Sequence, residues 1–174
     1  MKERRRHLRV PANYKTIIMR ENESKVNFIR DISSSGVFIE AVTLPKVGDV
    51  VYLMFPLHHP EKTVRTYGKV VRRVESVSED ELVLPGVGIE FVDIPFESSV
   101  LVEDYVVHVR YSYEELMLIL GMRNPDMKRL GQILKKINVG AYRDFFELKE
   151  KIKKTAYSMG ILKDDGDKNG AHIS

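Results

Sequence analysis

KVNFIRDISSSGVFIEA, residues 25–41, is the stretch that decides the fold. Its first part, Lys25–Asp31, alternates apolar and polar residues, which is the period of a β-strand that buries one face. The polar cluster Ser33–Gly36 interrupts this run, and β-forming residues resume over Val37–Ala41. The stretch therefore predicts two strands joined by a short polar connection.

Further strands are predicted on both sides of this pair. Tyr14–Arg20 precedes it, and β-rich stretches follow at Val50–Phe55, Val64–Val77 and Leu82–Ile94. Turn residues separate these stretches, as at Lys46-Val-Gly-Asp49. Short strands with turns at regular intervals are typical of an antiparallel sandwich or a small barrel.

The pattern changes after Pro95, where apolar residues recur at a helical period. We expect one helix over Phe96–Arg110. Ser112-Tyr-Glu-Glu115 has the spacing of a capping box, which predicts a second helix that ends at Gly121. Asn124 and Pro125 have the residue types of an N-cap and of a first helical position, which predicts a third helix.

A last helix is predicted to begin at Gly140 or Ala141 and to end at Gly160. The polar, Gly-rich residues 163–174 are predicted to form a disordered tail. The resulting division is a mainly β domain over 1–110, a small helical extension over 111–162, and the tail. At about 150 residues per domain, a chain of 174 residues fits one domain with an extension.

Composition excludes several classes of protein. The sequence has no cysteine, so disulfide frameworks, thiol catalysis and cysteine-ligated metals are excluded. No apolar run approaches the roughly 20 residues that span a bilayer. The charged N-terminus is followed by no apolar segment and therefore does not resemble a secretory signal. We expect a cytoplasmic protein, and nothing in the sequence suggests an enzyme.

Positive charge is concentrated towards the two ends of the chain. The net charge is only +3, but residues 1–10 and 123–163 are basic and residues 11–122 are acidic. Basic segments favour anionic partners such as phosphates or nucleic acid. The acidic body and the lack of an aromatic stacking pattern argue against generic nucleic-acid binding, which stays as an alternative.

Two short segments suit one kind of ligand. An arginine-rich arm, Arg4–Arg9, precedes the first strand, and Asp31–Gly36 connects the second strand to the third. Arginine bonds phosphate or the Hoogsteen edge of guanine through a planar fork. The Asp31 carboxylate accepts hydrogen bonds, as the N1 and N2 donors of guanine require. Gly36 permits either a positive φ or close approach of a ligand. Together the two segments suit a ligand that carries both phosphates and guanine.

The two segments resemble the motifs of the PilZ domain family. Arg5 and Arg9 match its RxxxR motif, and Asp31-Ile-Ser33-Ser-Ser-Gly36 matches its (D/N)xSxxG motif. Lys46-Val-Gly-Asp49 resembles the Gly-Asp turn of the family, and later strand signatures follow in order. The resemblance covers roughly residues 3–110, and the ordered set is far more specific than either motif alone.

The resemblance implies a bacterial receptor for cyclic di-GMP, with a six-stranded antiparallel β-barrel followed by C-terminal helices. It assigns phosphates and guanine Hoogsteen edges to Arg5 and Arg9. It assigns a guanine to Asp31 and Ser33.

The resemblance also assigns the shape of the connecting loop to Gly36. An arginine directly before RxxxR, here Arg4, is typical of members that bind two stacked ligands. We therefore expect an intercalated dimer of cyclic di-GMP.

The predicted helices match no family. They form either a packed scaffold or a ligand-dependent output surface or oligomer interface, and we favour packing together with a protein partner. A PilZ-like adaptor that does not bind ligand is a further alternative. His58 and His59 are expected in an exposed loop bracketed by Pro56 and Pro60, because no third metal ligand is close in sequence.

Overall fold

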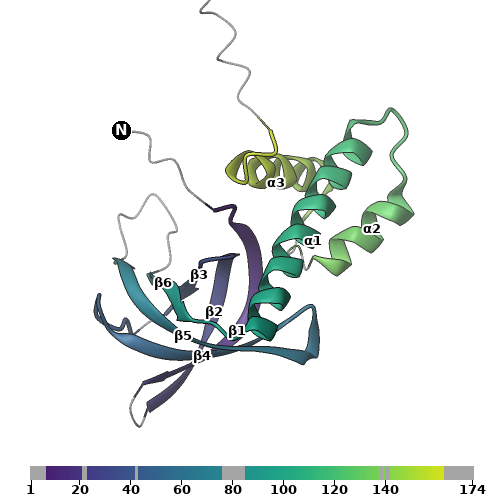
Figure 1. Ribbon diagram of the computed structural model, residues 1–174. Helices are drawn as coiled ribbons and strands as arrows, with labels where there is room; N and C mark the ends of the chain where they lie inside the picture. Colours follow the sequence, from purple (N-terminus) through teal and green to yellow (C-terminus); the bar gives the residue numbers. More distant parts are fainter. Residues whose placement is uncertain are drawn as a thin grey trace, which may run out of the picture. The chain divides into compact units, whose positions relative to one another are not determined.

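The structure is a computed structural model of the chain, and it describes residues 7–20, 23–41, 43–75, 85–137, 139 and 142–162. In these residues six β-strands are followed by three α-helices (Figure 1). The strands are β1 Val10–Arg20, β2 Glu23–Ser33, β3 Gly36–Glu40, β4 Val50–Leu57, β5 His59–Val74 and β6 Gly86–Asp93. The helices are α1 Phe96–Gly121, α2 Met127–Lys136 and α3 Phe145–Ser158.

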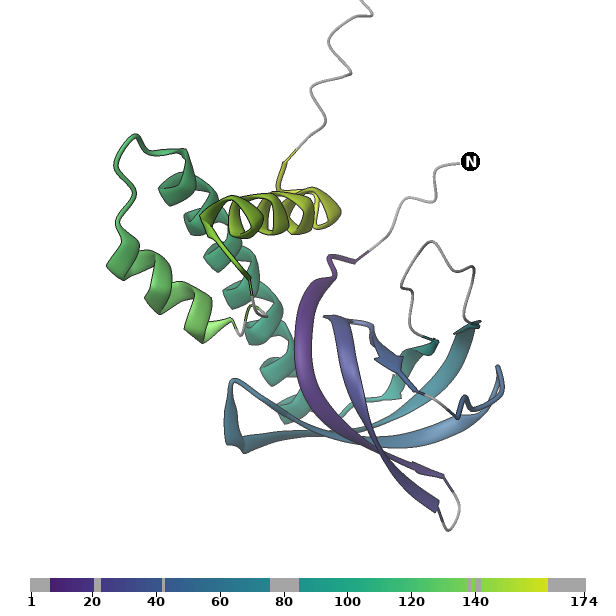
Figure 2. The ribbon, with the colours of Figure 1, turned by 180° about the vertical axis from the view of Figure 1, so that it is seen from behind.

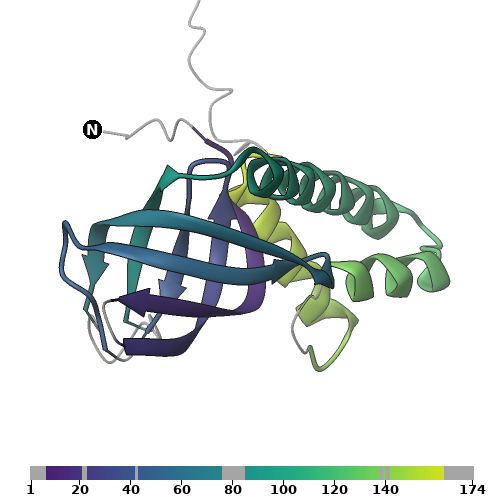
Figure 3. The ribbon, with the colours of Figure 1, turned by 60° about the horizontal axis from the view of Figure 1, so that its bottom comes forward.

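The six strands form a closed antiparallel barrel, in the order β1-β2-β3-β6-β5-β4 (Figure 3). β1 pairs with β2 along most of its length and with β4 only over Ile17–Met19, which closes the barrel. Figure 2 shows how strongly β1 curves as it passes along the barrel wall. The barrel core contains these fully buried apolar side chains: Ile29, Ile39, Leu53, Phe55 and Ile89. The predicted six-stranded antiparallel barrel with a helical extension is confirmed.

Helix α1 runs without a break from Phe96 to Gly121, so the predicted helix start at Ser112 is wrong. Ser112 lies inside the helix and is buried. Its neighbours Val109, Tyr113 and Leu116 are also buried and follow a helical period. Packing of this face favours a continuous helix, and it outweighs the local signal of a capping box.

The other two helices begin later than the sequence predicted. Asp126, and not Asn124, is the N-cap of α2, because its Oδ1 accepts from the backbone N–H of Arg129 at 2.9 Å. Asp144 is the N-cap of α3 and accepts from the N–H of Glu147 at 2.8 Å. The start predicted at residues 140–141 lies outside the described residues. In both helices an aspartate two or more residues beyond the expected start makes the capping bond.

Within the described residues, a positive φ occurs at Gly48, His58 and Gly160. Gly48 lies in the turn before β4, and Gly160 ends α3 as predicted. His58 has φ 60° in the tight turn between β4 and β5, where Leu57 is paired with His59. The loop predicted between Pro56 and Pro60 is therefore only a tight turn at His58, because β4 and β5 continue to the turn itself, and His58 is exposed as predicted.

The chain divides into two compact units, residues 1–108 and 109–174, and the division falls within α1. The first unit contains the barrel. The second has an apolar core of its own, with Leu116, Leu130, Leu148 and Ile152 fully buried. The predicted tail, 163–174, lies outside the described residues. Among the helices that the structure describes, none has the length and apolar character needed to cross a membrane.

Candidate ligand-binding site

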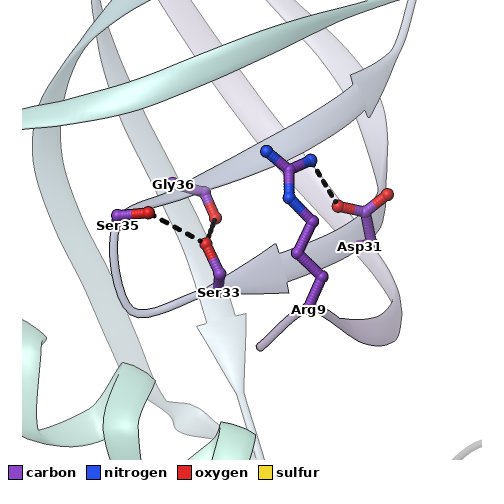
Figure 4. Close-up of polar contacts among 5 residues, drawn as sticks. All are labelled: Arg9, Asp31, Ser33, Ser35 and Gly36. Carbon is purple, nitrogen blue, oxygen red and sulfur yellow. Dashed lines mark hydrogen bonds and ion pairs between the residues drawn. The ribbon is translucent and has the colours of Figure 1, made fainter. Parts of the chain in front are cut away.

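Antiparallel pairing brings the predicted site residues Arg9, Asp31, Ser33 and Gly36 to one corner of the barrel (Figure 4). Arg9 directly precedes β1, and the first register pairs join the start of β1 to the end of β2. Ser33 ends β2 and pairs with Gly36 at the start of β3, across a two-residue turn. Arg4 and Arg5 lie outside the described residues.

Arg9 and Asp31 form an ion pair at this corner. Arg9 Nη1 donates to Asp31 Oδ1 at 3.2 Å. The side chains are 39% and 31% exposed, so the pair is open to solvent. The contact uses one of the five N–H donors of arginine and one of the two carboxylate oxygens. The corner therefore presents a cation and an anion side by side at the surface.

A β-bulge places Asp31 at this surface. The register between β2 and β3 shifts between Ile29 and Asp31. Ile29 and Ile32 are both buried, whereas Arg30 is exposed and Asp31 is partly exposed. A regular strand would send Asp31 to the same face as Ile29, because side chains alternate. The irregularity re-aims the side chain towards Arg9, as bulges next to binding sites do.

Ser33 is directed into the turn that joins β2 to β3. Its side chain is buried, and its Oγ donates to the carbonyl oxygen of Gly36 at 3.3 Å. The same Oγ lies 3.2 Å from Oγ of Ser35 (Figure 4). These contacts fix the shape of the turn, and the predicted contact between Ser33 and a guanine stays a prediction.

Gly36 lies so close to the neighbouring strand β6 that there is no room for a side chain. The residue lies in β3 opposite Glu90 of β6, and it is not among the residues with a positive φ. A Cβ atom at Gly36 would overlap the carbonyl oxygen of Ile89. Of the two roles that the sequence allowed for this glycine, the positive φ does not occur, and it is the close approach of β6 that requires a residue without a side chain.

A family model for the PilZ domain matches residues 3–108. The chain belongs to the PilZ family. The matched residues include both predicted motifs and the whole barrel. No curated protein was found to match this sequence.

Solved structures share the fold of this PilZ domain at low sequence identity. The motility inhibitor MotI/DgrA of Bacillus subtilis is 17% identical with a TM-score of 0.51, over 60% of this chain and 50% of that one. The PilZ domain of YcgR from Escherichia coli, solved with c-di-GMP, is 13% identical with a TM-score of 0.53, over 65% and 96%. The MrkH–c-di-GMP complex of K. pneumonia is 14% identical with a TM-score of 0.53, over 65% and 55%. The match thus spans about half of MotI/DgrA and of MrkH.

The PilZ structure also brings Arg72 near the predicted residues, and the sequence reasoning missed it. Asp31 pairs with Phe38, Phe38 with Gly88, and Gly88 with Arg72, so the four lie in one row across four strands. Arg72 extends over the ring of Phe38, with its Cζ 5.3 Å from the ring centroid. Gly88 carries no side chain to block this path. Only the register of the barrel reveals the arrangement, because residues 31 and 72 are far apart in sequence.

His7 is a second residue that sequence reasoning left out of the site. Its Nδ1 lies 3.2 Å from Oγ of Ser34, in the turn between β2 and β3. The arm that precedes β1 therefore contacts the turn through His7, the first residue that the structure describes.

Proposed function

We propose that this PilZ protein is a receptor for cyclic di-GMP, which it binds at the corner formed by Arg9, Asp31 and Ser33. The observation that carries the proposal is the open Arg9–Asp31 pair at 3.2 Å, built by the register of a PilZ barrel. The structures of YcgR and MrkH that share the fold contain c-di-GMP. The proposed role is binding and not catalysis.

The charges at the corner match the ligand. The Arg9 guanidinium can bond a phosphate or the O6 and N7 atoms of guanine. The Asp31 carboxylate can accept from the N1 and N2 donors of guanine. A partly exposed ion pair contributes only about 0–1 kcal/mol to stability, so a ligand can replace the Arg9–Asp31 contact at little cost. Gly36 contributes by letting β6 approach the turn.

Arg4 and Arg5 complete the proposed site from the arm. We assign Arg5 the phosphate and Hoogsteen contacts that the family motif implies. We assign Arg4 to a second, stacked cyclic di-GMP molecule, so that the ligand binds as an intercalated dimer. On this proposal the arm changes its conformation when the ligand binds, which requires that the ligand prefers the new conformation. A protein partner then senses the change through the helices of residues 111–162, in an output such as motility, surface polysaccharide or virulence.

Isothermal titration calorimetry with cyclic di-GMP tests the proposal. Arg5→Ala and Arg9→Ala should each weaken binding roughly tenfold to 100-fold, the range for a lost hydrogen bond to a charged group. Arg30→Ala is the matched control, because Arg30 is exposed on the same strand as Asp31 but pairs with Glu40 at 2.9 Å. A stoichiometry near two supports the stacked ligand, and a stoichiometry near one contradicts it.

Two outcomes would replace the proposal. A folded wild-type protein that does not bind cyclic di-GMP would favour a PilZ-like adaptor. Tight and salt-sensitive binding to generic DNA, without cyclic di-GMP binding, would favour a nucleic-acid module.

A further inference from the structure

Helix α1 is apolar on two opposite faces. One face is buried within the chain and includes Val102, Val106, Val109, Leu116 and Leu120. On the other face Phe96, Val100, Val107, Tyr111 and Leu118 are exposed, with 82% of Phe96 and 70% of Leu118 accessible. A helix that is apolar all round is normally buried all round. The exposed face, here named the outer stripe, therefore lacks the cover that its composition indicates.

The outer stripe follows an 11-residue repeat. Phe96, Val107 and Leu118 are each 11 positions apart, as are Val100 and Tyr111. Eleven residues make about three turns of α-helix, so these side chains remain in line along a nearly straight helix. Met122, directly after the helix and 54% exposed, continues the second series. Such a sustained repeat is typical of a surface that packs against another helix.

We propose that the outer stripe pairs with the same stripe of a second copy of this chain, antiparallel and centred on Val107. In this register Val107 faces its counterpart, and Phe96 faces Leu118 of the second copy at both ends. The 11-residue repeat thus places apolar contacts at three levels along the helix pair. The proposal is independent of cyclic di-GMP binding.

The charges on α1 select the antiparallel arrangement. Glu103 and Glu114 lie beside the outer stripe and are themselves 11 residues apart. A parallel pair in register would place each glutamate against its own counterpart, which is unfavourable. In the antiparallel register, Arg110 of the second copy lies level with residue 104 and on the same flank of the pair as Glu103. Arg110 already holds Glu114 of its own helix at 2.9 Å, so it would join two carboxylates.

The size of the stripe sets the strength of the expected dimer. A helix of 26 residues is about 39 Å long. A single pair of such helices buries less than the roughly 1,600 Å² of a standard protein interface. We therefore expect a reversible dimer that dissociates on dilution through the micromolar range.

Cysteine cross-linking tests the register, because the sequence has no cysteine of its own. Val107→Cys should form a covalent dimer on mild oxidation, since the two copies of residue 107 meet at the centre. Leu118→Cys alone should not, but a mixture of the Phe96→Cys and Leu118→Cys proteins should form heterodimers. Cross-linking of Leu118→Cys alone as efficient as that of Val107→Cys would overturn the antiparallel register.

Analytical ultracentrifugation tests the dimer itself. Val107→Glu should raise the dissociation constant at least tenfold, because it introduces a charge at the centre of the pair. Val26→Glu is the matched control, since Val26 is 66% exposed on β2 and outside the stripe. Circular dichroism confirms that both variants are folded. A wild-type protein that stays monomeric at about 100 µM, well above a micromolar dissociation constant, would overturn the proposal, and so would a control that loses the dimer equally.

Discussion

The barrel corner and the helical unit both contain an arginine–carboxylate pair, but they use it differently. At the corner, Arg9 touches Asp31 through one contact of 3.2 Å. In the helical unit, Arg129 of α2 holds Glu115 of α1 through two contacts of 2.6 and 3.0 Å. The hydrogen bonds from Arg129 lower the pKa of Glu115 and raise the pKa of Arg129. The two-contact pair links two helices, whereas the single contact leaves hydrogen-bonding capacity for a ligand.

The difference follows from what holds each region together. At the corner, the backbone ladder of the barrel already fixes the positions of Arg9 and Asp31, so the side chains need not bind each other tightly. The helices have no ladder between them and depend on side-chain contacts and on caps such as Asp126 and Asp144. The comparison predicts that side chains can be changed freely at the corner without unfolding it, but less freely among the helices.

The largest expected effect is a loss of helical stability that spares ligand binding. Ile152→Ala removes a fully buried side chain of α3 and should cost about 2–5 kcal/mol. Hydrogen exchange should show the loss in residues 109–162, while the affinity for cyclic di-GMP stays within about twofold, an energy difference below about 0.5 kcal/mol. Phe146→Ala, at a site on α3 that is 74% exposed, is the control and should change neither. A tenfold fall in affinity for Ile152→Ala would show that the two regions are not separable.

A pair of glycine substitutions should have opposite effects in the two regions. Gly36→Ala forces a Cβ against the carbonyl oxygen of Ile89 and should cost about 1–3 kcal/mol. Gly131→Ala, in the middle of α2 with nothing within 4 Å of its Cβ position, should stabilise by about 0.5–1 kcal/mol. Urea denaturation measures both. Equal behaviour of the two variants would contradict the close approach of β6 to the corner.

The sequence predicted the barrel and the corner better than the helices, for physical reasons. Strand alternation and turn residues are local signals, and the described residues of the two motifs lie beside strand ends that the ladder brings together. The first residue of each helix could not be predicted, because more than one polar side chain near each helix start can make the capping bond. Asp126 and Asp144 make the capping bonds, although Asn124 offered the same chemistry two residues earlier.

Other features depended on distant parts of the chain and could not be predicted. The register of four strands brings Arg72 over Phe38, and the approach of β6 explains Gly36. Ser112 has the residue type and spacing of a helix cap, but it is buried in the interior of α1. Each of these is a tertiary contact with no trace in a short window of sequence.

A smaller effect is expected from removing the ion pair at the corner. Asp31→Asn should change the free energy of unfolding by less than about 1 kcal/mol, because both partners are partly exposed. The same variant should weaken binding of cyclic di-GMP only modestly, since the amide keeps one oxygen acceptor for the guanine donors but loses the negative charge and the second oxygen. Denaturation and calorimetry on one preparation measure the two effects. A stability loss of several kcal/mol would mean that the pair is structural, like its counterpart among the helices.

The smallest effects concern the titration of two glutamates in the helical unit, and they separate two causes of a lowered pKa. Hydrogen bonds from the Arg129 side chain are the main cause at Glu115. At Glu147 the main cause is the backbone N–H of Arg143, at 2.8 Å. Arg129→Gln should therefore return the pKa of Glu115 towards its ordinary value of 4.5, whereas Arg143→Gln should move that of Glu147 less. Carboxyl NMR titration distinguishes the two.

The sign of the accompanying stability change follows from linkage. A carboxyl group whose pKa is lower in the folded state contributes stability above its unfolded pKa, and this contribution is lost as the pH falls through the folded pKa. Wild-type protein should thus lose helical stability below about pH 4.5, and Arg129→Gln should lose less of it over the same range, because its Glu115 has a nearly ordinary pKa. Arg143→Gln retains the backbone donor and should follow the wild type more closely. If wild type and Arg129→Gln lose the same stability as the pH falls, the two-contact pair does not distinguish the helical unit from the barrel corner.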